Sequence, residues 1–175
     1  MITDSKKLLV LSTFLFLLIG CNFPTSLKPY KMSASSMKPT INKNDRIIAD
    51  YSFYKNETPK RGDIVVFRYP KDPKKIWIKR LIAFGGENIE IKDGTILING
   101  EILNQSNISI IKYSNAGDFG SKGVAALVPE DNYFLLGDNS EQSLDSRYFG
   151  PIPKENVVAK ATIIYWPLTR LGEIE

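Results

Sequence analysis

Two residues of this chain, Ser36 and Lys79, could form a nucleophile and its base. The 175 residues include no histidine, so a reactive serine here could not use imidazole as its base. A serine hydroxyl needs a neighbouring base to take its proton, and lysine fills that role on several unrelated folds. Lysine can do so only when it is neutral, which requires its pKa to fall from about 10.4 by roughly 3 units. Catalysis by Ser36 therefore depends on what surrounds Lys79.

Lys79 lies within an apolar run, Ile76–Ile82, of the kind found in buried strands. Burial disfavours the ammonium form and can lower a lysine pKa by the required amount. In a strand, Trp77 and Leu81 share a face with Lys79, whereas Arg80 points to the opposite face. The pattern predicts a neutral amine between two large apolar side chains.

The composition is that of one ordinary globular domain, since 43% of the residues are apolar. The net charge of +4 is mild and gives no independent sign of nucleic-acid binding. With Cys21 as its one cysteine and no histidine, the chain is expected to hold neither an intramolecular disulfide nor a zinc or copper site. The loop that carries Asp138 and Asp145 lacks the glycine and terminal glutamate of an EF-hand, so no metal or other cofactor is expected.

Residues 1–27 have the pattern of a signal peptide or a membrane anchor. Two lysines precede the apolar run Leu8–Gly20, and no further charge appears before Lys28. This run is too short to cross a bilayer, whereas Leu8–Leu27 could just span it. Residues 18–21 also resemble a bacterial lipoprotein processing box, in which Cys21 would carry lipid. Both alternatives place the rest of the chain on the outer side of the cytoplasmic membrane, because the lysines stay inside.

Beyond residue 28, short runs of β-branched and aromatic residues alternate with turn residues, which is typical of strands. The dipeptides Asp93-Gly94 and Asn99-Gly100 tolerate the positive φ angles of two-residue hairpin turns, so they predict a meander over residues 88–103. The predicted strands are Arg46–Tyr51, Ile64–Tyr69, Ile76–Phe84, Asn88–Lys92, Thr95–Ile98, Tyr133–Leu136 and Val157–Tyr165.

These patterns predict a mainly β fold in three parts. Residues 1–27 form the signal or anchor segment, and residues 28–87 together with 132–175 form a core of antiparallel sheets. Residues 88–131 form a small inserted cap, because the meander is followed by a stretch, 104–122, that is rich in Asn, Ser and Gly.

Four segments in one order resemble the type I signal peptidases, membrane-bound serine endopeptidases that remove signal peptides from exported proteins. They are Ser36-Met37-Lys38-Pro39-Thr40, Arg61–Phe67, Lys79-Arg80 followed by Gly85-Gly86-Glu87, and Gly137–Gly150. The resemblance covers nearly the whole chain after the anchor. It implies a signal-peptidase-like core of antiparallel sheets with an inserted β cap, preceded by a membrane segment.

The resemblance also implies roles for individual residues. Ser36 would be the nucleophile, Lys79 the general base, and the hydroxyl of Ser143 would hold the lysine amine. A hydroxyl suits this task because it can accept from the amine without adding a charge. The backbone N–H of Ser36 would form one arm of an oxyanion hole. Many relatives have a hydroxyl two residues earlier as the second donor, but Ala34 stands there, so a neighbouring serine or the backbone alone would have to serve.

Two ion pairs are expected to support this site, Arg80 with Asp138 and Arg147 with Asp145. Such pairs are structural by default, because neither charge of a buried pair is free to act on a substrate. They are therefore interpreted as groups that hold the site in place.

A substrate is expected to lie extended along an exposed strand edge and to add main-chain hydrogen bonds as a temporary strand. The resemblance implies small residues, typically alanine, at the first and third positions before the cut. Shallow apolar pockets walled by Met37, Trp77 and Ile78 would exclude larger side chains. The expected partners are exported preproteins and membrane lipid, with no nucleic acid. The expected location is the bacterial cytoplasmic membrane, with the catalytic domain on the outer side.

Three alternatives differ in what the chain does. A conjugation-type maturation peptidase would use the same Ser and Lys pair. A self-cleaving repressor-type peptidase carries a cleavable Ala-Gly linker before its serine, but here Ala116-Gly117 follows both Ser36 and Lys79. A membrane-tethered β-rich binding module without catalysis would use the basic stretch Lys71–Arg80 to contact an anionic surface or nucleic acid.

Overall fold

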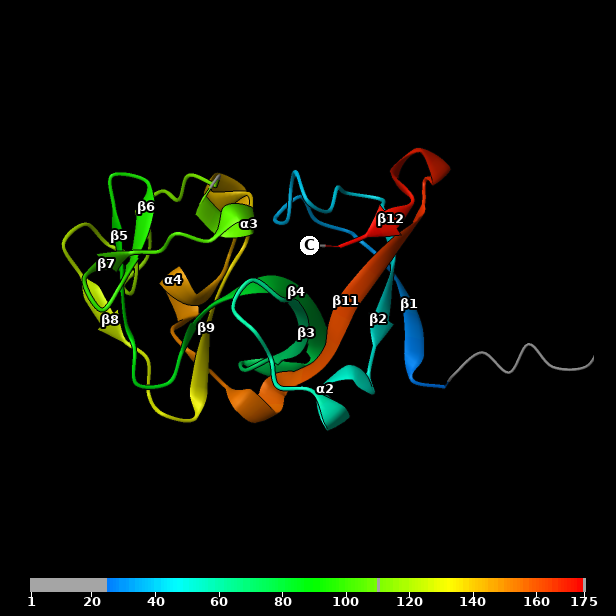
Figure 1. Cartoon of the computed structure of the whole chain (residues 1–175), viewed down its shortest axis with the longest axis horizontal. Helices are drawn as coiled ribbons and strands as arrows, with labels where there is room; N and C mark the ends of the chain where they lie inside the picture. The colour runs from blue at the N-terminus through cyan, green and yellow to red at the C-terminus, as the bar shows by residue number, and fades with distance from the viewer. Residues whose placement is uncertain (1–24, 110, 175) are drawn as a thin grey trace, which may run out of the picture.

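The structure is a computed structural model that describes residues 25–109 and 111–174 (Figure 1). Most of the predicted anchor segment 1–27, including the lipidation candidate Cys21, lies outside the described residues. Within the described ranges, no helix is long and apolar enough to cross a membrane. The predicted anchor therefore stays a prediction.

An eight-stranded antiparallel sheet forms the larger part of the fold, with strand order β1-β2-β11-β3-β4-β9-β10 and β12 paired to β11. The long strands β4 and β11 pass through its middle and curve strongly in Figure 1. Its strands are β1 (Leu27–Lys31), β2 (Arg46–Asp50), β3 (Ile64–Tyr69), β4 (Asp72–Phe84), β9 (Asn132–Leu136), β10 (Ile152–Pro153), β11 (Val157–Trp166) and β12 (Gly172–Glu173).

A second antiparallel sheet of four strands lies to one side of the first in Figure 1, with order β7-β6-β5-β8. The two predicted hairpin turns are confirmed, since Asp93, Gly94, Asn99 and Gly100 have φ angles of 51°, 83°, 53° and 85°. The sheet falls within 88–131, and the treatment of that range as an inserted cap stays a prediction. Its strands are β5 (Asn88–Lys92), β6 (Thr95–Ile98), β7 (Glu101–Ile102) and β8 (Ala125–Leu127).

The described helices are short and lie in the connections. They are α2 (Phe53–Asn56), α3 (Ser106–Ser109), α4 (Ser146–Phe149) and the 3₁₀ turns η1 (Ser140–Gln142), η2 (Lys154–Asn156) and η3 (Leu168–Arg170). The mainly β prediction is confirmed, because antiparallel sheets carry the fold and each described helix spans three or four residues.

Three apolar clusters fill the interior, and β4 contributes to all of them because it is buried on both faces. Ile78 belongs to the cluster beneath the segment that carries Met37, and Ile82 belongs to the cluster between the two sheets. Leu81 packs in a third cluster, against which the partly buried Trp77 also lies. This burial accounts for the long apolar run in β4 and places Lys79 in a region with little access to water.

Candidate active site

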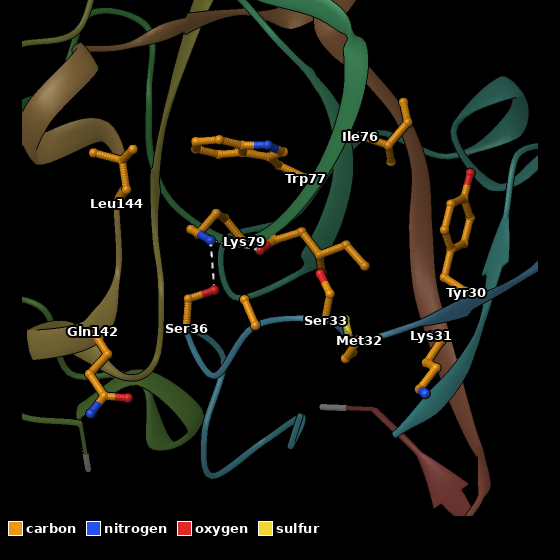
Figure 2. A pocket seen from close by; sticks show the side chains of 12 residues that line it. Tyr30, Lys31, Met32, Ser33, Ser36, Ile76, Trp77, Lys79, Gln142 and Leu144 are labelled. Atoms are coloured by element: carbon orange, nitrogen blue, oxygen red, sulfur yellow. Dashed lines mark hydrogen bonds between the residues drawn. The ribbon is translucent and has the colours of Figure 1, made fainter. Parts of the chain in front are cut away.

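Ser36 and Lys79 come together although 43 positions separate them in the sequence. Ser36 lies in the turn that follows β1, and Lys79 lies in the middle of β4, where sheet pairing fixes its backbone. Their side chains point toward each other in Figure 2, with 2.9 Å between Lys79 Nζ and Ser36 Oγ. The amine also donates to the carbonyl oxygen of Ile78 at 3.2 Å. In its neutral form the amine has a lone pair that can accept the hydroxyl proton.

Burial controls the charge of this amine, since Lys79 is only 4% exposed. Loss of hydration lowers the pKa of Lys79 to about 8, and this effect outweighs the attraction of the Asp145 and Asp138 carboxylates, which raise it. The nearby Arg147 guanidinium lowers the pKa further. The apolar run around Lys79 predicts this cause of the lowered pKa, namely burial of the amine. A substantial fraction of the amine is therefore neutral near pH 8.

We expect the rate of any reaction that uses Lys79 as its base to rise with pH through a midpoint near 8. The amine is charged below its pKa and neutral above it, so kcat should fall about tenfold per pH unit below the midpoint and reach a plateau above it. The check is kcat measured from pH 6 to 10 with saturating substrate. A flat profile over this range would contradict a lysine base.

The turn that carries Ser36 is bound to the loop after β9. The backbone N–H of Asn139 donates to the carbonyl oxygen of Ser36 at 3.0 Å, and its side-chain amide donates to that of Ser35 at 3.1 Å. Further along, Thr40 Oγ1 donates to Asp138 Oδ2 at 2.5 Å. These three bonds fix the nucleophile segment relative to the last of the four predicted motifs.

Both expected ion pairs are present and buried. Arg80 donates to both carboxylate oxygens of Asp138 at 2.9 and 2.8 Å, and its Nη1 reaches the carbonyl oxygen of Gly62. Arg147 contacts both oxygens of Asp145 at 2.8 Å. Bidentate geometry and additional acceptors compensate the cost of burying four charges, so these pairs hold two loops in place around Lys79.

The predicted contact between Ser143 and Lys79 is absent here. Ser143 Oγ is buried, yet it has no hydrogen-bond partner among the described residues, and the amine bonds Ser36 and the Ile78 carbonyl instead. The Ile78 carbonyl belongs to the residue before Lys79 in the same strand. It is therefore already in place to accept a hydrogen bond from the amine. The hydroxyl lies instead beside Gly137, where a Cβ added to Gly137 would lie 2.1 Å from Ser143 Oγ.

Gly137 separates Ser143 from the nucleophile turn. A Cβ added there would lie 2.5 Å from the carbonyl oxygen of Ser36, which Asn139 holds in place. The Ser143 hydroxyl could rotate away, but the Ser36 backbone could move only by shifting the nucleophile. We therefore expect Gly137→Ala to lower kcat about 100-fold.

The matched control for this substitution is Gly172→Ala, because nothing lies within 4 Å of a Cβ added at Gly172. Steady-state kinetics of both variants check the expectation, with circular dichroism to measure the folded fraction. Equal activity in the two variants would mean that the turn tolerates the displacement.

A cavity of about 380 Å³ opens beside the pair and exposes it to a ligand. In Figure 2, Leu144 and Gln142 stand on one side of Ser36, Trp77 lies beyond Lys79, and the β1 side chains stand on the other side. The lining residues are Tyr30, Lys31, Met32, Ser33, Ala34, Ser36, Ile76, Trp77, Ile78, Lys79, Gln142 and Leu144.

Of the three residues predicted to wall a substrate pocket, Trp77 and Ile78 line this cavity and Met37 does not. Met37 is fully buried in the cluster beneath the nucleophile turn and does not line the cavity. The reason is local, because the backbone N–H of Ile41 bonds the Met37 carbonyl at 2.8 Å and closes a turn over residues 37–41. This turn leaves Ser36 at the cavity and directs the next side chain into the core.

Several lining residues carry no signal in the sequence. Tyr30 and Lys31 belong to β1, a short edge strand whose proline obscures the alternating pattern of a strand. Gln142 is the last residue of η1, and Leu144 lies in the loop that follows it. Their place at the cavity depends on the tertiary structure, which brings β1 and the loop after η1 close to Lys79 in β4. Ser33 and Ala34 also line the cavity. Ser33 therefore offers a hydroxyl one residue before Ala34, the position at which many relatives have the second oxyanion donor.

The known proteins that this chain resembles are described as peptidases. Residues 5–166 match the family described as signal peptidase, peptidase S26. Signal peptidase I of Leptolyngbya laminosa is 35% identical over 149 residues, which cover 81% of this chain and 70% of that protein. Signal peptidase I V of Bacillus subtilis is 36% identical over 136 residues, covering 74% and 80%. A solved signal peptidase I structure from Enterococcus faecalis is 33% identical, covering 59% of this chain and 97% of that one, with a TM-score of 0.47.

Proposed function

This chain belongs to the signal peptidase family, peptidase S26, and we propose that it removes N-terminal signal peptides from exported preproteins with Ser36 as nucleophile and Lys79 as general base. The observation that carries the proposal is the 2.9 Å contact between a buried amine and a serine hydroxyl that both line one cavity. Burial favours the neutral amine, as a lysine base requires.

The proposed reaction proceeds through an acyl-enzyme. Lys79 Nζ takes the proton of Ser36 Oγ while the oxygen attacks the scissile carbonyl, and the resulting ammonium then protonates the departing amine. The neutral Lys79 amine next takes a proton from water, which attacks the ester carbonyl. The ammonium then gives that proton to Ser36 Oγ as the ester bond breaks and the signal peptide leaves with its new carboxylate. One lysine thus serves every proton transfer.

The backbone N–H of Ser36 is the first proposed donor to the oxyanion, and Ser33 is a candidate for the second because its side chain lines the same cavity. Ala34 has no donor in its side chain. The substrate proposal keeps the preference for small residues before the cut, since the apolar residues Trp77 and Ile78 line the same cavity as Lys79. Trp77 lies beside Lys79 in Figure 2. Attachment to the bacterial cytoplasmic membrane through residues 1–27, with the catalytic part outside, is proposed from the sequence alone.

The test is cleavage of a purified preprotein by the full chain in detergent, with the new amino terminus of the product read by mass spectrometry. We expect a single cut after a small residue. A matched preprotein with tryptophan at the position before the cut should remain intact, because the proposed pocket for that residue is shallow and accepts only small side chains. Cleavage of both substrates at the same site, or of neither, would refute the proposed activity or its specificity.

A further inference from the structure

The C-terminal 3₁₀ turn η3 contacts the nucleophile segment through one side chain, Arg170. Its Nη2 donates to the carbonyl oxygen of Thr40 at 2.9 Å and to that of Pro39 at 3.3 Å. Its Nε donates to Asp45 Oδ2 at 3.0 Å. One guanidinium therefore joins three points of the segment that leads away from Ser36.

The carbonyls that Arg170 binds lie in the turn over residues 37–41, directly after Ser36. The Ile41 N–H closes this turn on the Met37 carbonyl, and no backbone N–H among the described residues bonds the carbonyl of Pro39 or Thr40. Arg170 supplies donors to both of them. The guanidinium thus fixes the end of the turn at the level of the backbone.

Asp45 gives the guanidinium a fixed partner. It is 3% exposed, and its Oδ2 also accepts from the backbone N–H of Asn42 at 2.7 Å. A buried carboxylate needs a cation, and Arg170 is the ion-pair partner that the structure gives it. The position of Arg170 is therefore set by Asp45, and the position of the turn follows from Arg170.

The turn is consequently held from two sides. Asp138 and Asn139 bind it through the Thr40 hydroxyl and the Ser36 carbonyl. Arg170 binds the Thr40 carbonyl from η3, 130 positions away in the sequence. Lys79 is fixed separately by its place in β4. The distance between Oγ and Nζ therefore depends on whether the turn stays where both sets of bonds place it.

We propose that Arg170 is a positioning residue that sets the distance between the nucleophile and its base without contacting the substrate. The inference rests on the proposed function, because it assigns a role relative to the Ser36 reaction. It is carried by two hydrogen bonds to carbonyls of the turn after Ser36 and a third to Asp45, and Arg170 is not among the residues that line the cavity.

The test compares Arg170→Ala with wild type in preprotein cleavage by the full chain. We expect kcat to fall about 10- to 100-fold, since small displacements of reacting groups have effects of this size. KM should stay within about twofold, because the cavity is unchanged. The pH midpoint of kcat should also stay near that of wild type, because Arg170 does not contribute to the environment of Lys79.

A readout specific to positioning is rescue by guanidinium ion at low, non-denaturing concentration. The Arg170 side chain is 32% exposed in its ion pair, so a small cation can reach the vacated site. Rescue should restore at least a third of the lost activity in Arg170→Ala. Arg170→Lys should be intermediate, because an ammonium cannot bond three acceptors in the plane that a guanidinium spans. The control is Leu168→Ala in the same turn, which is 68% exposed and should behave as wild type.

Two results would overturn the proposal. One is a raised KM with unchanged kcat, which would place Arg170 in substrate binding. The other is a loss of activity that matches a loss of folded protein and that guanidinium does not restore, which would make Arg170 only a stabilising residue. Failure of the proposed function is distinguishable from both, because wild type itself would then cleave no preprotein.

Discussion

Ser36→Ala should reduce preprotein cleavage about 10⁵-fold while leaving the fold intact. Removing a nucleophile abolishes the covalent pathway, and the remaining activity comes only from binding and oxyanion contacts. The hydroxyl makes one hydrogen bond, to Lys79 Nζ, whereas the backbone carbonyl that fixes the turn is retained in alanine. Initial rates under saturating substrate measure the effect, with thermal unfolding to confirm the folded state.

The matched control is Ser35→Ala, one residue earlier. Ser35 contributes its backbone carbonyl, which accepts from Asn139 Nδ2 and from the Lys38 N–H, and alanine keeps that carbonyl. We therefore expect activity within about threefold of wild type. Comparable losses in the two variants, or substantial cleavage by Ser36→Ala, would remove Ser36 from the mechanism.

Much of the fold follows from periodicity and turn chemistry. The runs that became β3, β5 and β6 have the predicted bounds, because β-branched residues alternate with clear turn residues at both ends. β4 starts at Asp72, four residues before the predicted Ile76, since hairpin pairing with β3 extends through polar residues that carry no apolar pattern. Pairing between strands, rather than local sequence, sets that boundary.

The strands that were not predicted are edge or two-residue strands. β1 contains Pro29 among exposed side chains, and β8 is the three-residue run Ala125–Leu127. Such segments become strands only because a partner strand already exists beside them, so their own residues give a weak signal. β1 matters most for function, since it brings Tyr30 and Lys31 to the cavity.

The site shows the same division between local and long-range information. Ser36 and Lys79 could be proposed from the sequence because each lies in a motif with a chemical meaning. Met37 does not line the cavity, because its side chain is buried in the core at the start of the turn over residues 37–41. Arg170 carries no motif, and its contacts with residues 39–45 depend on the C-terminal strand pairing that brings η3 to the Ser36 turn.

Lys79→Met should abolish activity and, at pH 7, make the protein more stable. Loss of the general base should lower kcat about 10⁴-fold. The stability gain has a separate cause, because at pH 7 wild type must bury an ammonium whose pKa is lowered from 10.5 to about 8. That shift corresponds to about 3 kcal/mol of destabilisation, and methionine has a similar shape without the charge.

The sign of the pH dependence distinguishes this explanation from improved packing. The unfolded chain keeps the lysine proton up to about pH 10.5, whereas the folded chain loses it near pH 8. Between these values the unfolded state binds more protons, so the free energy of unfolding of wild type rises with pH. The advantage of Lys79→Met should therefore be greatest below pH 8 and largely vanish by pH 10.5.

Urea unfolding of both proteins at pH 7 and pH 10 measures this difference directly. A gain that shrinks with pH means that wild type gives up stability to keep a titratable amine beside Ser36, as expected for a catalytic base. A gain that is the same at both pH values would show that the amine does not titrate in this window, and the lysine could then not act as the base near neutral pH. The stability and the activity of Lys79→Met thus both test whether burial lowers the pKa of the Lys79 amine.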